Sequence, residues 1–251
     1  MTLALTLVLV NSCSNIKTAV SKLTDKNQVK SKFKPMDIPK DIENSTADEH
    51  SSEENTVIIS QSDGTNFFIG EDDYPLEVVT EKLESLFKKN PSEKQLIYLN
   101  ASGYTEFGDI VKLLAAVRKT NVENVGLWVL PKVKNETGFN ILKVKIPAEP
   151  KDSDLNTKPN PMTLVVVIQK DGKFKLNNEI VSADFLRLRL KQVFKDRETN
   201  VVFRQGTNDI EKTVTVKSSK SIKYGEVVKL IDTVTGAGAS PVILQIDDLE
   251  Q

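Results

Sequence analysis

The sequence predicts an α+β protein with two tandem ββαβαβ modules, each a two-layer unit of a small sheet and two helices. In residues 221–238, SIKYGEVVKLIDTVTGAG, apolar residues at helical spacing follow a Tyr-Gly turn, and glycines suited to a helix cap end the run. Residues 104–122, YTEFGDIVKLLAAVRKTNV, repeat this arrangement at an offset of 117 residues, from Gly108 to Gly225. A helix that recurs with its turn and flanking strands indicates a duplicated domain.

The composition is typical of a soluble globular chain. Its 251 residues suffice for two modules of roughly 100 residues each. A balance of 34 basic and 35 acidic residues argues against a nucleic-acid-binding platform. One Cys and one His exclude an intramolecular disulfide and a Cys/His zinc site, and we expect no metal or cofactor. His50 lies in an acidic polar run typical of a linker, which argues against a catalytic triad.

Residues 1–13 resemble an export signal. The run LALTLVLV is too short for a spanning helix, which needs roughly 20 residues, but it suits the apolar part of a signal peptide. The sequence Val-Asn-Ser-Cys that follows resembles a bacterial lipobox, so Cys13 is the candidate lipid attachment site. No Lys or Arg precedes the apolar run, so an ordinary secretory peptide and a clipped transmembrane helix stay open as alternatives.

Residues 14–55 are predicted to form a disordered tether. They are rich in charged and small polar residues and show no sustained apolar period. Prolines at positions 35 and 39 would interrupt a helix. We expect this segment to hold the folded part away from a membrane surface.

The first module is predicted to span residues 56–131. Two strand-forming runs flank an Asp63-Gly64 turn, which is typical of a hairpin. A helix with an apolar stripe follows Pro75 and ends before Asn90-Pro91. The remaining predicted elements are a strand over 95–99, a helix over 108–120 and a strand over 125–130.

Residues 132–162 are predicted to be a linker with one solvent-facing strand over 142–146. The second module, residues 163–251, repeats the first one, and Asp171-Gly172 corresponds to Asp63-Gly64. Residues 186–190, LRLRL, alternate like a strand, but agreement with the first module favours a helix capped by Ser182. About ten extra residues between Phe194 and Thr213 have no counterpart in the first module, and their structure is left open between a strand and a loop.

The order of strands, Asp-Gly turn and helices, followed by VTVKSSKSIKYGEVVKLID, GAG and a closing strand, resembles the periplasmic domain of the ExbD/TolR biopolymer-transport family. The resemblance implies a bacterial envelope protein that assists proton-motive-force-coupled transport. It also implies contacts with motor subunits or TonB/Tol-like proteins, contact with peptidoglycan, and homodimerisation. In that family a transmembrane helix carries an Asp on the proton path, and we expect this chain as written not to supply that step.

Four residues are candidates for a partner contact. Phe107-Gly108 and Tyr224-Gly225 stand at the two repeated turns, where a surface next to a helix N-terminus could bind a partner. The alternative role is local: the aromatic ring packs under the turn and the glycine supplies the backbone angle. No residue is a convincing catalyst, so we expect a protein that is not an enzyme, anchored by its N-terminus. The alternatives are a peptidoglycan-binding envelope lipoprotein without a motor role and an enzyme of unknown type on an α+β scaffold.

Overall fold

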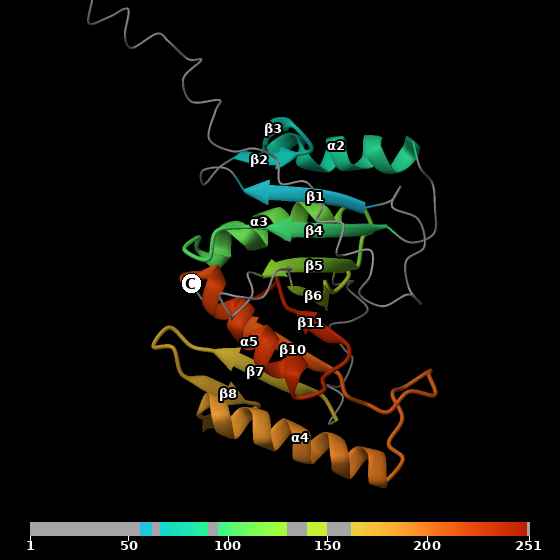
Figure 1. The fold of residues 1–251 in the computed structure, drawn as a ribbon, viewed down its shortest axis with the longest axis vertical. Coiled ribbons are helices and arrows are strands. Elements are labelled where there is room, and N and C mark those ends of the chain that lie inside the picture. Colours follow the sequence, from blue (N-terminus) through green and yellow to red (C-terminus); the bar gives the residue numbers. More distant parts are fainter. Residues whose placement is uncertain (1–55, 62–65, 90–94, 130–139, 150–161, 250–251) are drawn as a thin grey trace, which may run out of the picture. The chain divides into compact units, whose positions relative to one another are not determined.

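Alternating burial marks the strands of one large sheet. In β7 (Leu164–Ile168) and β10 (Val214–Ser218) every second side chain is buried and the others are half-buried, as expected when one face of a sheet is covered. The computed structural model describes residues 56–61, 66–89, 95–129, 140–149 and 162–249. Within these ranges four helices and one sheet form the fold, which confirms the predicted mixed α+β class (Figure 1). Cys13, the tether, the Asp63-Gly64 turn and residues 150–161 of the linker lie outside the described residues.

Two halves with the same order of elements flank a joining strand. The first half, residues 56–129, contains β1 (Thr56–Gln61), β2 (Asn66–Ile69), β3 (Asp72–Pro75), α2 (Leu76–Lys89), β4 (Leu96–Asn100), α3 (Phe107–Arg118) and β5 (Asn124–Val129). The second half, residues 162–249, contains β7, β8 (Phe174–Leu176), β9 (Glu179–Val181), α4 (Ala183–Thr199), β10, α5 (Tyr224–Gly236) and β11 (Val242–Leu244). The short strands β3 and β9 precede α2 and α4 and were not predicted.

The joining strand β6 (Asn140–Lys145) makes one sheet from both halves. The strand order is β3-β2-β1-β4-β5-β6-β11-β10-β7-β8-β9. Strand β6 pairs antiparallel with β5 and parallel with β11, where Ile243 lies opposite Lys145. The strands of the second half therefore run opposite to those of the first half. The sequence predicted a small sheet in each module, whereas the structure has one shared sheet. The predicted strand between the modules is β6, in the middle of that sheet, and its Lys143 and Lys145 side chains are exposed as the alternation predicted.

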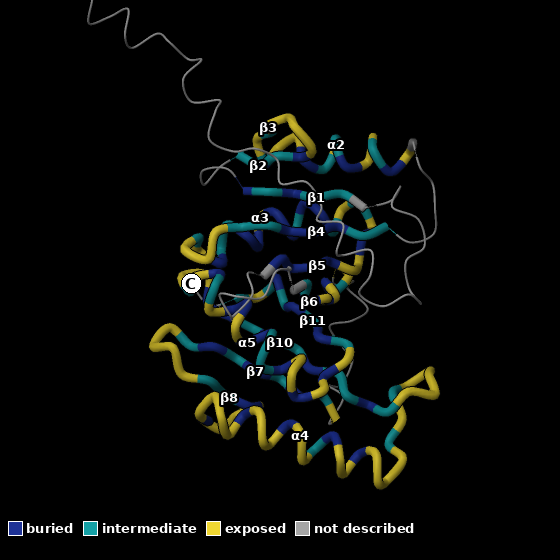
Figure 2. Tube along the Cα trace, in the orientation of Figure 1, coloured by how far each residue is buried: buried dark blue, intermediate teal, exposed yellow. Residues whose placement is uncertain are grey.

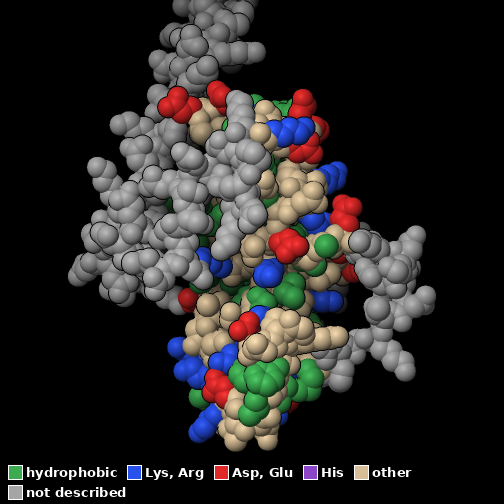
Figure 3. Space-filling view, turned by 90° about the vertical axis from the view of Figure 1, so that its right-hand side faces the viewer, with side chains coloured by type: hydrophobic (Ala, Val, Ile, Leu, Met, Phe, Trp, Pro, Cys, Tyr) green, Lys and Arg blue, Asp and Glu red, His purple; other side chains and the backbone are tan. Residues whose placement is uncertain are grey.

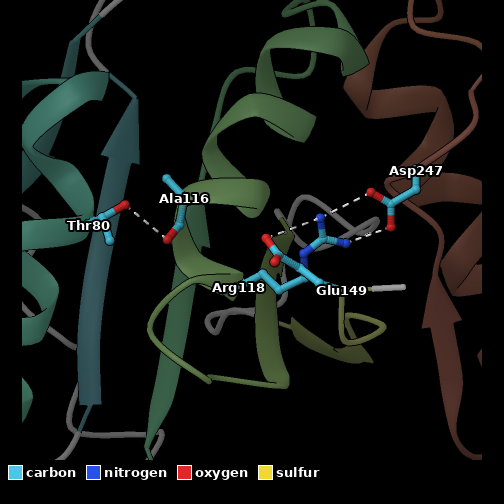
Figure 4. A network of polar contacts seen from close by, with 5 residues as sticks. All are labelled: Thr80, Ala116, Arg118, Glu149 and Asp247. Atoms are coloured by element: carbon cyan, nitrogen blue, oxygen red, sulfur yellow. Dashed lines mark hydrogen bonds and ion pairs between the residues drawn. The ribbon is translucent and has the colours of Figure 1, made fainter. Parts of the chain in front are cut away.

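The helices form one continuous layer over the sheet. Helix α2 contacts α3, α3 contacts α5, and α5 contacts α4. Thr80 of α2 donates a hydrogen bond to the Ala116 carbonyl of α3 at 3.2 Å (Figure 4). The core between the layers is apolar and includes fully buried residues from both halves, among them Ile59, Leu83, Val166, Leu186 and Ile231 (Figure 2). Burial of this apolar surface is the main term that stabilises the fold.

Local signals in the sequence fix the ends of two helices. The Ser182 hydroxyl accepts a hydrogen bond from the Phe185 N–H at 3.3 Å, which confirms the predicted cap of α4. Helix α5 ends at Gly236, and Gly238 has a φ of 103°, which suits a residue without Cβ. The apolar stripe over LRLRL belongs to helix α4, as the comparison with the first module predicted.

The extra residues of the second half form an irregular excursion between α4 and β10. One isolated bridge pairs Phe203 with Ile210, so the segment 200–212 contains no regular strand. The buried Arg197, near the end of α4, connects both ends of this segment to the rest of the second half. Its guanidinium donates hydrogen bonds to the carbonyl of Glu211, at 2.8 Å, and to the carbonyl of Met162. Burial lowers the pKa of Arg197 from its ordinary value because the charged form loses hydration.

Candidate contact site between the two halves

Helices α3 and α5 begin without a side-chain cap. The residues before them, Glu106 and Lys223, have extended backbones, and neither side chain bonds to the first turn. The first N–H groups of a helix have no partner inside the helix. Because Phe107 and Tyr224 are buried, water cannot satisfy their N–H groups, and other acceptors are required.

Each helix obtains these acceptors from the other half. The Phe107 N–H donates to the Ile222 carbonyl at 2.8 Å, and the Gly108 N–H donates to the Lys220 carbonyl at 2.8 Å. In the second half, the Tyr224 N–H donates to the Thr105 carbonyl at 2.8 Å, and the Gly225 N–H donates to the Gly103 carbonyl at 3.0 Å.

These four bonds form two equivalent pairs. The offset of 117 residues that relates Gly108 to Gly225 also relates Thr105 to Ile222 and Gly103 to Lys220. At the centre, Glu106 forms an antiparallel bridge with its own equivalent, Lys223. We call residues 103–108 and 220–225 together the seam. Its bonds follow an approximate two-fold relation between the halves.

Two glycines allow the backbones to approach closely at the seam. A Cβ atom at Gly225 would lie 3.0 Å from the Gly103 carbonyl oxygen and 3.2 Å from the Gly103 Cα. A Cβ atom at Gly108 would lie 3.1 Å from the Lys220 Cβ. Contacts this short require a shift of one of the backbones, so a side chain at Gly225 would push the halves apart.

The two aromatic residues pack beneath the seam. Phe107 is fully buried and Tyr224 is 1% exposed. The Tyr224 hydroxyl has no hydrogen-bond partner among the described residues. Burial raises the pKa of Tyr224 because its anion would lose hydration. An unpaired buried hydroxyl costs free energy, so Tyr224 contributes here through its ring.

The surface of the seam is polar. Lys223 Nζ lies 3.7 Å from Glu106 Oε1, and both side chains are more than half exposed, so this ion pair contributes little. An open depression lies beside it, lined among others by Asp109, Lys112, Lys220 and Asp248. Its charges are mixed in sign, and the described ranges hold no group of three His, Cys, Asp or Glu residues placed to share a metal ion.

A second contact between the halves lies at the other end of α3. Arg118 Nη1 lies 2.5 Å from Asp247 Oδ2, and Nη2 lies 3.0 Å from Asp247 Oδ1 (Figure 4). Glu149, which follows β6, is 4.0 Å from the same guanidinium. Arg118 and Asp247 are mostly buried, with side-chain exposures of 12% and 23%. This bidentate ion pair connects the first half to the segment after β11.

The predicted contact residues therefore lie together in the structure. Phe107, Gly108, Tyr224 and Gly225 meet at the seam and contact the opposite half; their contact with another protein stays a prediction. Sequence reasoning missed Gly103, Thr105, Lys220 and Ile222 because they contribute carbonyl oxygens, which every residue type has. It also gave no signal for Asp247, which follows β11 and pairs with Arg118.

Comparison with known families now decides the assignment. A family model described as Biopolymer transport protein ExbD/TolR matches residues 23–132 and, a second time, residues 127–249. The chain belongs to the ExbD/TolR family. The two matches are consistent with tandem copies, which the resemblance predicted. Each match begins upstream of the predicted module, at residue 23 instead of 56 and at residue 127 instead of 163. A search among curated proteins found no match.

Membership places the chain among bacterial envelope components with a role in biopolymer transport, and the family is not known for enzymes. Its members work with motor complexes of the envelope. Among the described residues, no helix has the length and apolar character needed to cross a bilayer.

Proposed function

We propose that this ExbD/TolR family member is a periplasm-facing protein, anchored through its N-terminus, that assists proton-motive-force-coupled transport by contacting motor subunits, TonB/Tol-like proteins or the cell wall. The two halves are its two family modules, at the predicted bounds of residues 56–131 and 163–251. Cys13 is the proposed lipid attachment site.

The observation that carries this proposal is the seam. Four main-chain hydrogen bonds and a shared sheet fix the two family copies in one arrangement. A protein that transmits force or position between a motor and a partner needs such a fixed relation between its contact surfaces. The tandem chain supplies both copies covalently, so a second molecule is not needed to form the pair.

The test uses the full chain expressed in a bacterium from which its own gene has been deleted. We expect the protein in the membrane fraction, co-purification with the proton-channel subunit of the envelope motor, and loss of energy-dependent uptake or envelope integrity in the deletion strain. Gly225→Val, whose Cβ atom would crowd the Gly103 backbone at 3.0–3.2 Å, should strain the seam and weaken the complementation. Gly236→Ala is the matched control on the same helix, because a Cβ atom there meets only the Arg187 side chain at an ordinary 3.8 Å.

Two results would overturn the motor role. One is a fully complementing Gly225→Val protein whose seam is shown to be open. The other is a membrane-bound chain that sediments with isolated peptidoglycan and never with motor subunits. The second result would establish the peptidoglycan-binding lipoprotein instead.

A further inference from the structure

Helices α2 and α4 occupy equivalent places in the two halves but differ on their outer faces. Their buried positions correspond at an offset of 107 residues and are apolar in both helices: Val79, Leu83 and Phe87 in α2, and Leu186, Leu190 and Phe194 in α4. The fold therefore requires apolar side chains on the inner faces of both helices. Packing sets no such requirement on the outer faces, where a difference in residue type indicates a difference in function.

The outer face of α4 carries large apolar side chains in solvent. Phe185 is 47% exposed, and Leu188, one turn further on, is 67% exposed. Gln192 follows at the next turn, and these three positions form the outer ridge of α4. Ile180 on the adjoining edge strand β9 is 60% exposed. The position equivalent to Phe185 on α2 is Val78, which is 37% exposed, but the positions equivalent to Leu188 and Lys191 are Glu81 and Glu84.

Cations flank the outer ridge on both sides. Helical spacing puts Arg189 on one side of it and Lys191 and Lys195 on the other. Over its whole length α4 contains five cations and three acids, of which Asp184 and Asp196 lie near the ends of the outer ridge, whereas α2 contains three cations and three acids. None of the ion pairs between described residues includes Arg189, Lys191 or Lys195. Figure 3 shows hydrophobic side chains with basic and acidic ones beside them in the lowest part of the face it views, where α4 and the excursion that follows it both lie in Figure 1.

We propose that the outer face of α4 docks on an anionic lipid surface. An apolar ridge between rows of Lys and Arg is the pattern by which a helix lies in the headgroup region of a bilayer. The ridge enters the boundary of the acyl chains while the long cationic side chains reach anionic headgroups. The charge of the face selects this occupant, because an uncharged apolar partner would leave the cations without counter-charges. The inference stands on α4 alone and does not depend on the transport role.

The single cysteine of the chain permits a local test. In the full chain with Cys13→Ser, Gln192→Cys is labelled with an environment-sensitive fluorophore on the outer ridge. Ser85→Cys, the equivalent exposed position on α2, is the matched control. The apolar N-terminal run is the same in both proteins, so any difference between the two labels reports the helices.

With vesicles of phosphatidylglycerol mixed with phosphatidylethanolamine, we expect a blue shift at position 192 and none at position 85. With pure phosphatidylcholine vesicles, we expect no shift at either position. Leu188→Glu with Lys191→Glu should weaken the vesicle response at least tenfold, since one cation at an anionic surface is worth about fivefold in affinity. The residues Glu81 and Glu84 show that the fold accepts these side chains, and thermal unfolding checks it.

Three results with the labelled proteins would overturn the proposal: no shift at position 192, an equal shift at both labels, or a response to phosphatidylcholine as large as that to phosphatidylglycerol. In the first case the ridge would instead be a surface for a protein partner. An unchanged affinity of the folded double variant for anionic vesicles would also contradict it.

Discussion

Phe107 and Tyr224 occupy equivalent positions in the two halves, at the first residue of α3 and of α5, and both are buried at the seam. One carries a hydroxyl and the other does not. The carbonyl acceptors next to them also correspond, although their side chains are as different as those of Gly103 and Lys220. The two copies therefore share backbone geometry and buried volume, which the common sheet requires. They differ in side chains that reach solvent, such as that of Lys220, and in the Tyr224 hydroxyl, which has no hydrogen-bond partner among the described residues.

The largest expected effect opens the seam. In Gly225→Val the new Cβ atom would lie 3.0 Å from the Gly103 carbonyl oxygen, so the two backbones must separate by a few tenths of an ångström and the hydrogen bond between them lengthens. We expect a loss of about 3 kcal/mol in the free energy of unfolding. Urea denaturation of the full chain measures it, with Gly236→Ala expected to be neutral or slightly stabilising. An unfolding midpoint for Gly225→Val equal to that of the wild type would show that the close approach is not required.

The next effect concerns the ion pair between Arg118 and Asp247, which joins the halves and has no two-fold equivalent. Arg118 has no cationic counterpart on α5, where the equivalent residue is Thr235. Asp247→Asn removes the nearer negative charge and leaves the mostly buried guanidinium with only the exposed Glu149 at 4.0 Å, so we expect a loss of about 2 kcal/mol. Asp248→Asn, at the exposed neighbouring residue, is the control and should stay within about 0.5 kcal/mol of the wild type. Equal unfolding midpoints for both variants would mean that the pair adds nothing to stability.

A stabilising change is expected in the excursion that only the second half contains. Val201 follows the C-cap of α4 with a φ of 53°, a left-handed conformation that is strained for a β-branched residue. Its N–H donates to the Glu198 carbonyl and the Val202 N–H to the Arg197 carbonyl, which is a pattern that favours glycine between them. Because Val201 is 57% exposed, Val201→Gly should gain about 1 kcal/mol. Val202→Gly, at the half-buried next residue, should lower the thermal midpoint instead; a lower midpoint for Val201→Gly would contradict the strain.

The smallest effect tests the difference between the two aromatic residues. Tyr224→Phe removes a buried hydroxyl without a partner among the described residues, so stability should be unchanged or rise by up to about 1 kcal/mol. The reciprocal Phe107→Tyr should cost about 1–3 kcal/mol, since it buries a new hydroxyl.

The same pair predicts a pH dependence. The pKa of Tyr224 is raised in the folded state, so the neutral ring contributes stability that is present below about pH 10 and lost as the pH rises further. Tyr224→Phe removes this contribution to the alkaline slope. Urea midpoints at about pH 8 and about pH 11 measure it. If the urea midpoints of wild type and variant differ by the same amount at both pH values, the pKa of Tyr224 is not raised by folding.

By itself, the sequence determined the elements and the duplication. Apolar spacing predicted α2, α3 and α5, and agreement with the first module predicted α4, with Ser182 at its start. The offset between the modules identified equivalent residues, and its rise from 107 to 117 identified the extra segment after α4. Two positions equivalent by offset can still lie far apart, so the offset did not reveal that the halves bond to each other. The short strands β3 and β9 have few apolar residues and gave no periodic signal.

Only the tertiary structure decided how the copies meet. The seam rests on carbonyl oxygens of Gly103, Thr105, Lys220 and Ile222, and main-chain acceptors leave no mark on residue type. The position of β6 depends on pairing with β5 and β11, strands whose partners lie up to about a hundred residues apart. Local patterns in a sequence reflect which face of an element is buried, whereas the choice of partner depends on the free energy of the whole sheet.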